Sequence, residues 1–128
     1  MTSSIPRVSV ILPVRDAEKT LAVAVESILG QTERNLELLV VDDGSTDASP
    51  RILQEFAELD GRIRVLSTVN PGIVEALNLG LEEARAPYLA RMDSDDISLP
   101  ERLGLQCDFL DANPEVGLVS CRVEHWSE

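Results

Sequence analysis

Basic residues are scarce in this sequence. Lys and Arg number 11 against 23 Asp and Glu in 128 residues, which gives a formal net charge of −12. Because nucleic-acid binding depends on cationic side chains that neutralise phosphates, this balance argues against a nucleic-acid partner. It argues equally against peripheral binding to an anionic membrane. A phosphorylated ligand would need a metal cation to bridge it to so acidic a protein.

Long apolar runs and targeting signals are also lacking. No segment approaches the roughly 18 apolar residues of a membrane span. The N-terminal MTSSIPRVSV has no basic segment followed by an apolar core, so it does not resemble a signal peptide. The two cysteines, Cys107 and Cys121, form no CxxC pair and lie in apolar surroundings. We expect two reduced thiols in the core of a cytoplasmic protein.

Glycine-rich phosphate loops are absent as well. Neither GxxxxGK[ST] nor GxGxxG occurs, which argues against a P-loop or a Rossmann dinucleotide site. What the sequence does have is a hydrophobic content of 44% in 128 residues. That length and composition suit one folded domain, which we assign to residues 1–128.

Apolar runs of strand length alternate with helical patterns along the chain. Strands are predicted at residues 8–13, 36–41, 63–67, 88–92 and 116–123. The helices between them are expected to bury faces that contain Leu21, Val25, Ile28 and Leu29; Ile52, Phe56 and Leu59; Val74, Leu77, Leu81 and Ala84; and Leu103, Cys107 and Leu110. This alternation predicts an α/β fold with a mostly parallel sheet and helices on both faces.

Acidic turns follow three of these strands, at residues 13–18, 42–47 and 93–96. In open α/β sheets, ligands bind beyond the carboxyl ends of the strands, so the three turns are expected to line one crevice. Clustered carboxylates repel one another unless a cation joins them, and Mg²⁺ binds carboxylates together with substrate phosphates. Carboxylates also accept the imide N–H of uracil or the hydroxyls of ribose. The turns therefore predict a site for a nucleotide diphosphate with a metal.

Four segments, in this order and spacing, carry a family resemblance. VSVILPVRDAEKTL, LLVVDDGSTD, NPGIVEALNLGLEEA and YLARMDSDDISLPERL resemble the inverting family 2 glycosyltransferases of the GT-A fold, over roughly residues 6–123. The resemblance implies a nucleotide-diphospho-sugar donor, with UDP favoured, and Mg²⁺ or Mn²⁺ as cofactor. It also implies transfer of a glycosyl group to a carbohydrate or lipid-linked acceptor.

The resemblance implies roles for particular residues. Asp42 resembles the carboxylate that contacts the base, and Asp43 is its neighbour in the same motif. Asp93-Ser94-Asp95 resembles the DxD motif, in which the first acid faces the ribose and Asp95 binds the metal. The loops beside the base match Pro13, Val14 and Asp16 on one side and Asn70 and Gly72 on the other. Arg15-Asp16 replaces the Tyr-Asn frequent in the family, so the base contacts are expected to differ.

No general base for an inverting transfer is found. Such a base deprotonates the acceptor hydroxyl, and in the family it lies well after the DxD motif. His125, a single histidine near the end of the chain, is interpreted as incidental. The expectation is the donor-binding part of a longer enzyme, with the sheet truncated after about the fifth strand.

Three alternatives can be weighed against this interpretation, and the residues argue against the second and third. A non-catalytic module of the same fold would pair with another copy through its open side, giving a homodimer. A receiver domain needs an Asp after the third strand and a Lys after the fifth, but here Leu66-Ser67-Thr68 ends the third strand and no Lys follows Lys19. A nucleotidyltransferase would carry a basic, glycine-rich loop early in the chain, which VRDAEKT is not.

Overall fold

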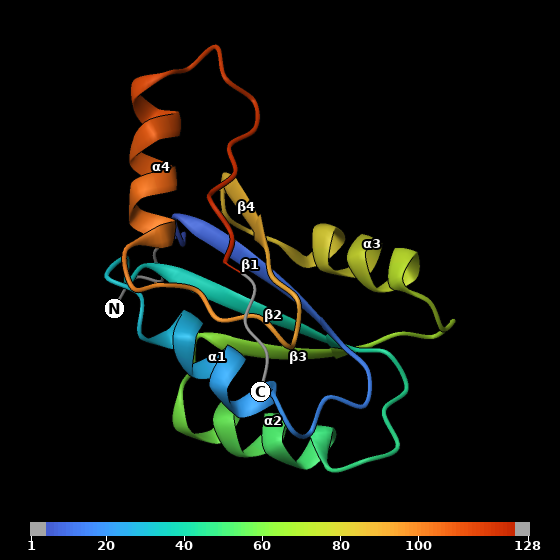
Figure 1. Ribbon diagram of the computed structural model, residues 1–128. Helices are drawn as coiled ribbons and strands as arrows, with labels where there is room; N and C mark the ends of the chain where they lie inside the picture. The colour runs from blue at the N-terminus through green and yellow to red at the C-terminus, as the bar shows by residue number, and fades with distance from the viewer. Residues whose placement is uncertain (1–4, 125–128) are drawn as a thin grey trace.

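The alternation of strands and helices is confirmed by a computed structural model, which describes residues 5–124. The elements follow in the order β1 (Val8–Val14), α1 (Leu21–Leu29), β2 (Leu36–Asp42), α2 (Ser49–Leu59), β3 (Ile63–Ser67), α3 (Ile73–Glu83), β4 (Tyr88–Arg91) and α4 (Arg102–Ala112) (Figure 1). The first four predicted strands are therefore present, each within one residue of its expected ends.

The four strands form one parallel sheet in the order β3-β2-β1-β4. Strand β1 lies inside the sheet, and all seven of its residues are buried. Its register places Val14 opposite Asp42 and Ile11 opposite Arg91. The loops that follow β1, β2 and β4 therefore leave the same edge of the sheet, as the acidic turns predict.

Helices cover both faces of the sheet, which confirms the predicted layering. Leu21, Leu53 and Leu103, from α1, α2 and α4, belong to the core on one face. A smaller cluster on the other face joins Ile11 and Val41 to Ala76 of α3. Figure 1 shows α3 on the side of the sheet opposite α1 and α2.

The predicted fifth strand is wrong. Residues 113–124 form no strand, and Leu118 and Val123 are 87% and 67% exposed. An alternating apolar pattern becomes a strand only when a neighbouring strand satisfies its backbone groups. Among residues 5–124 the sheet pairs only β1 with β2, β1 with β4 and β2 with β3. The segment therefore stays irregular beside the open edge of β4.

Two helices bury faces that differ only in part from those predicted, since Ile52 and Phe56 of α2 and Leu77 of α3 pack against the core as expected. In α2, Leu59 is 87% exposed, and Leu53 takes the central buried position. In α3 the buried residues are Ala76 and Gly80, whereas Val74 and Leu81 are exposed. Small residues on this face bring α3 close to the sheet, since a Cβ added to Gly80 would lie 2.6 Å from Cγ2 of Ile11. Close approach therefore decides the buried face of α3, rather than side-chain size.

The two cysteines differ in environment. Cys107 is buried in the core as predicted, and this burial raises the pKa of its thiol. Cys121 is exposed, so its predicted place in the core is wrong because the strand expected to carry it does not form. His125 lies outside the described residues. Between residues 5 and 124, no helix has the length and apolar character needed to cross a bilayer.

Candidate functional site

The loops after β1 and β2 are joined through Asp16. Its Oδ1 accepts the N–H of Thr46 at 2.7 Å and that of Asp47 at 3.3 Å, while its own N–H donates to Oγ of Ser45 at 2.9 Å. Asp16 has a left-handed backbone with φ of 48°, a conformation that Asp tolerates better than most residues. The first two predicted acidic turns therefore meet, and Asp16 fixes one against the other.

A second pair of acids strengthens the same contact. The N–H of Glu18 donates to Oδ2 of Asp47 at 3.1 Å, and the N–H of Ala48 donates to Oε2 of Glu18 at 3.3 Å. Oδ1 of Asp47 accepts the N–H of Ser49, the first residue of α2, at 2.8 Å. Desolvation acts to raise the pKa of Asp47, but hydrogen bonds from Ser49 and Glu18 outweigh it, and the pKa is lowered. Asp47 is thus a structural residue at the start of α2.

Asp42 and Asp43 point to different partners. Asp43 is buried, and its carboxylate accepts the hydroxyl of Thr68 at 3.0 Å and the N–H of Gly72 at 3.0 and 3.1 Å. Gly72 has φ of 132°, which only glycine adopts readily, so this N–H can turn toward the carboxylate. Asp43 thereby holds the loop that carries Asn70, and Asn70 itself is exposed. Asp42 is half-buried at the end of β2, where its Oδ1 accepts the N–H of Ser45 at 3.2 Å.

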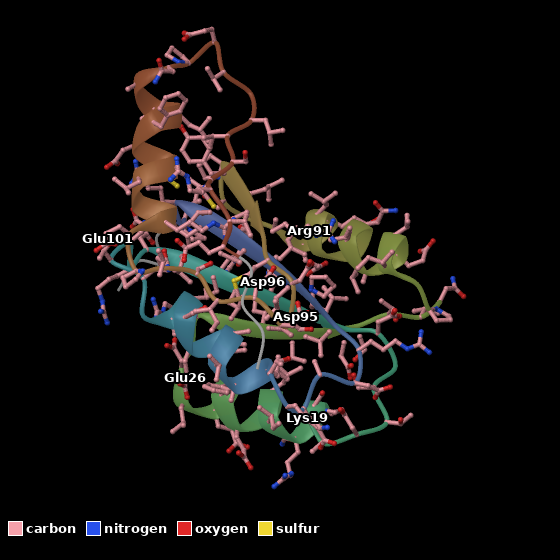
Figure 2. The ribbon with its side chains drawn as sticks, viewed as in Figure 1. Lys19, Glu26, Arg91, Asp95, Asp96 and Glu101 are labelled. Carbon is pink, nitrogen blue, oxygen red and sulfur yellow. The ribbon has the colours of Figure 1, made fainter. Side chains whose placement is uncertain are left out.

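A cluster of carboxylates lies on residues 92–101, which we call the acidic loop. Carboxylate oxygens of Asp93, Asp95 and Asp96 lie within 4.8 Å of one another, and all three residues are exposed. Figure 2 shows the acidic loop with Asp95 and Asp96 labelled. Asp93 also contacts Nη2 of Arg91 at 3.3 Å. The prediction named only Asp95 as the metal ligand; the adjacent Asp96 was the available signal for a third carboxylate.

The acidic loop has a suitable donor set for a hard divalent cation. Mg²⁺ and Mn²⁺ prefer carboxylate oxygens and keep positions open for water and phosphate. Three carboxylates this close repel one another, and a bound cation would relieve that repulsion. Their exposure leaves room for a second ligand on the same ion. The residues present therefore fit the expected metal.

Polar residues at the two ends of α1, to which the sequence assigns no role, hold the acidic loop. Thr20, before α1, donates its hydroxyl to the carbonyl of Ser94 at 2.9 Å. Gln31, after α1, donates to the carbonyl of Leu99 at 2.7 Å and is 1% exposed. A polar residue next to a helix end is usually solvated, so no local pattern predicts its burial.

Comparison with known sequences identifies the family. Residues 9–127 match Glycosyl transferase family 2. The chain is 42% identical over 108 residues to a "Putative glycosyltransferase EpsE" of Bacillus subtilis, covering 83% of this chain and 39% of the relative. It is 38% identical over 120 residues to an "Uncharacterized glycosyltransferase" of Haemophilus influenzae, covering 93% of this chain and 37% of the relative. The chain thus spans less than half the length of these relatives.

Solved structures with the same fold hold nucleotides. A mannosyltransferase, PcManGT of Pyrobaculum calidifontis in complex with GDP-Man and Mn²⁺, matches with a TM-score of 0.81 and 29% identity, over 95% of this chain and 37% of that one. S. aureus TarS 1-349 in complex with UDP matches with a TM-score of 0.77 and 27% identity, over 84% and 33%. These likenesses confirm the GT-A fold. Together with the match over residues 9–127, they show that the chain belongs to glycosyl transferase family 2.

Proposed function

We propose that this chain binds a nucleotide-diphospho-sugar, with a UDP-sugar favoured, beyond the carboxyl ends of β1, β2 and β4. One observation carries the proposal: Asp93, Asp95 and Asp96 gather within 4.8 Å at that edge, in a chain of glycosyl transferase family 2. Similar structures in complex with UDP, UDP-GlcNAc and GDP-Man support it. Family membership favours UDP, and GDP is the competing nucleotide.

The proposed roles follow the resemblance of the motifs to the family. Asp42 accepts a hydrogen bond from the base, and Asp93 with Ser94 contacts the ribose side of the nucleotide. Asp95, together with Asp96, holds Mg²⁺ or Mn²⁺, which when bound neutralises the diphosphate and stabilises it as a leaving group.

The remaining predicted residues form the walls of the site. Pro13 and Val14 end β1 and are buried, so they place the start of the first loop rigidly. Asp16 and Asp43 use their carboxylates to fix the neighbouring loops. Asn70 and Gly72 lie on the loop that Asp43 holds, and we assign this loop to the far side of the base. These residues act mainly by shaping the pocket for the nucleotide.

The longer protein would be an inverting hexosyltransferase that acts on a carbohydrate or lipid-linked acceptor. Deprotonation of the acceptor hydroxyl requires a general base, which we assign to no residue between 5 and 124. Two free thiols, Cys107 and Cys121, favour a reducing compartment, and we propose the cytoplasm.

Calorimetric titration tests the donor site. Wild type and Asp95→Ala are titrated with UDP, and with GDP as a competitor, in the presence and absence of Mn²⁺. The expected result is Mn²⁺-dependent binding of UDP that Asp95→Ala loses. Glu58→Ala, which removes an exposed acid of α2, is the matched control and keeps wild-type binding. Absence of binding by either nucleotide to the wild type would contradict the proposal.

A non-catalytic module is the second candidate, and exposed apolar residues favour it. Leu81, Leu89 and Leu118 are 49%, 52% and 87% exposed around a hollow of about 500 Å³ beside β4. In this alternative the chain pairs with a second copy through that side. Nucleotide binding separates the two candidates, because pairing alone requires no donor site.

A further inference from the structure

The acidic loop connects β4 to α4 without forming a helix or strand of its own. Its three clustered carboxylates repel one another, so their charges do not keep them within 4.8 Å. A local turn, in which the N–H of Asp96 donates to the carbonyl of Asp93 at 3.1 Å, brings these residues together but does not attach the loop to the rest of the fold. Backbone hydrogen bonds hold its two ends, from the N–H of Met92 to the carbonyl of Ile11 at 3.2 Å and from the N–H of Thr32 to the carbonyl of Pro100 at 2.8 Å, and side chains must fix the main chain between them. The structure shows which side chains do so.

Gln31 makes the most deeply buried of these contacts. Its Nε2 donates to the carbonyl of Leu99 at 2.7 Å and to that of Ser27 at 3.0 Å, and its Oε1 accepts the N–H of Leu103 at 2.9 Å. With 1% of its surface exposed, the amide has no access to solvent. One side chain thus joins α1, the end of the acidic loop and the first turn of α4.

Neighbouring residues extend the same attachment along the loop. The N–H of Ser98 donates to Oγ of Ser27 at 3.1 Å, and Arg102 donates to Oγ of Ser98 at 3.0 Å and to the carbonyl of Arg91 at 3.1 Å. The hydroxyl of Thr20 donates to the carbonyl of Ser94 at 2.9 Å. These contacts engage the backbone or Ser98 and leave the aspartate carboxylates exposed.

We propose that Gln31 is a positioning residue for the cation and the donor diphosphate, acting through the backbone of the acidic loop. The inference rests on the proposed function and adds a residue to it. Attachment to α1 keeps the carboxylates gathered before the cation arrives, so binding does not have to order the loop. If the loop holds its binding conformation for only a fraction of the time, the measured association constant for the ligand falls to that fraction of its full value.

The first variant is Gln31→Met, which keeps the length of the side chain and removes all three hydrogen bonds. Mn²⁺ binding is measured by electron paramagnetic resonance without nucleotide, and UDP binding by calorimetry with and without Mn²⁺. At a temperature well below the unfolding transition, affinity for Mn²⁺ and for UDP with Mn²⁺ is expected to fall about tenfold. Titration of UDP without Mn²⁺ gives the baseline for each protein, since the proposed donor site depends on the cation. Gln54→Met, on the exposed face of α2, is the matched control.

Thr20 supplies a milder test if Gln31→Met does not fold. Thr20→Val removes the hydrogen bond to Ser94 at a half-buried position, whereas Thr20→Ser keeps the hydroxyl. We expect Thr20→Val to weaken Mn²⁺ binding a few-fold. Thr20→Ser should bind Mn²⁺ with the affinity of wild type. A residue that only stabilises the fold would lower the melting temperature of these variants without changing Mn²⁺ affinity.

Wild-type Mn²⁺ affinity in a folded Gln31→Met variant would by itself overturn the inference. If Gln31→Met does not fold, wild-type affinity in Thr20→Val would overturn the attachment of the loop to α1 on which the inference rests. A wild type that binds Mn²⁺ but no nucleotide would overturn the proposed donor site, while the Mn²⁺ titrations still decide the role of Gln31. A wild type that binds neither ligand would overturn both.

Discussion

Glu37 is a buried charge that the structure satisfies completely. It lies in β2 with 2% of its surface exposed. Its carboxylate accepts the hydroxyl of Ser9 at 2.6 Å, the backbone N–H of Arg85 at 2.7 Å and the Arg85 guanidinium at 3.0 Å. Burial acts to raise the pKa of Glu37, but the hydrogen bonds from Ser9 and Arg85 and the charge of Arg85 lower it overall. The carboxylate fixes the segment between α3 and β4 to the sheet.

The first prediction concerns this carboxylate. Glu37→Gln is expected to lower the free energy of unfolding by about 1–3 kcal/mol at neutral pH, because hydrogen bonds to a charged group are lost. Since the folded-state pKa lies below the unfolded value, this contribution is present above the unfolded pKa and disappears as the pH falls through the folded one. Urea unfolding across acid and neutral pH should therefore show the difference from wild type shrinking at acid pH. A difference independent of pH would contradict this account, and Glu58→Gln serves as a surface control.

The acidic loop leads to the second prediction. Without metal, Asp96→Asn removes one of three exposed like charges, so the melting temperature is expected to rise by about 1–3 °C at low ionic strength. Salt should reduce this gain, because it screens repulsion between exposed charges. Mn²⁺ should stabilise wild type more than the variant, since it binds the folded wild type better. Thermal unfolding with and without Mn²⁺ measures both effects, and equal stabilisation by Mn²⁺ would count against Asp96 as a ligand.

At the scale of elements, the contact of α3 with β1 depends on a glycine. Gly80 faces Ile11, and a Cβ at this position would lie 2.6 Å from Cγ2 and 3.1 Å from Cγ1 of that residue. Alanine is the better helix former by about 1 kcal/mol, so propensity alone favours replacing the glycine. The packing of the helix against the sheet opposes it.

The third prediction tests which effect is larger. Gly80→Ala is expected to destabilise the protein by about 1–3 kcal/mol, because overpacking forces α3 away from the sheet. In Gly80→Ala with Ile11→Ala, the two costs should be less than additive, since the second change makes room for the added methyl group. Chemical unfolding of the single and double variants measures this coupling. Gly61→Ala has no neighbour within 4 Å and should be nearly neutral; a neutral Gly80→Ala would show that α3 tolerates the shift.

At the scale of the whole molecule, the sheet has an open edge at β4. Within residues 5–124, β4 pairs only with β1, and exposed Leu89 lies on it beside the hollow of about 500 Å³. Open strand edges with apolar neighbours favour pairing with another chain, and natural proteins prevent this with lysine. The second candidate function depends on this side of the molecule.

The fourth prediction follows from that edge. If the chain pairs through β4, wild type should sediment as a dimer at high concentration, and Leu89→Lys should be monomeric. Leu59→Lys, at an exposed site on α2, is the control and should leave the dimer intact. Sedimentation equilibrium gives the association constant for each. A monomeric wild type would exclude pairing through this edge.

Local patterns in the sequence were sufficient to predict the order of the strands and helices. They also predicted that the acidic residues lie at the carboxyl ends of the strands. Apolar runs of strand length gave β1 to β4 because their periodicity and turn residues are local properties. The acids follow the strands in the sequence, so a parallel sheet brings them to one edge. The prediction of a fifth strand was wrong because a strand needs a neighbouring strand for its backbone hydrogen bonds, and a local sequence pattern does not show whether one is present.

Tertiary structure alone decided which carboxylates remain available to a ligand. Asp16 and Asp43 bind backbone N–H groups of loops about 30 residues away, whereas Asp93, Asp95 and Asp96 stay exposed. Gln31 meets the carbonyl of Leu99 across 68 residues of chain. The physical reason is that a side chain forms hydrogen bonds with the groups that lie next to it in the folded protein, and these groups can be distant in the sequence. Sequence therefore determined where the acids are, and only packing determined which of them hold neighbouring loops and which stay exposed.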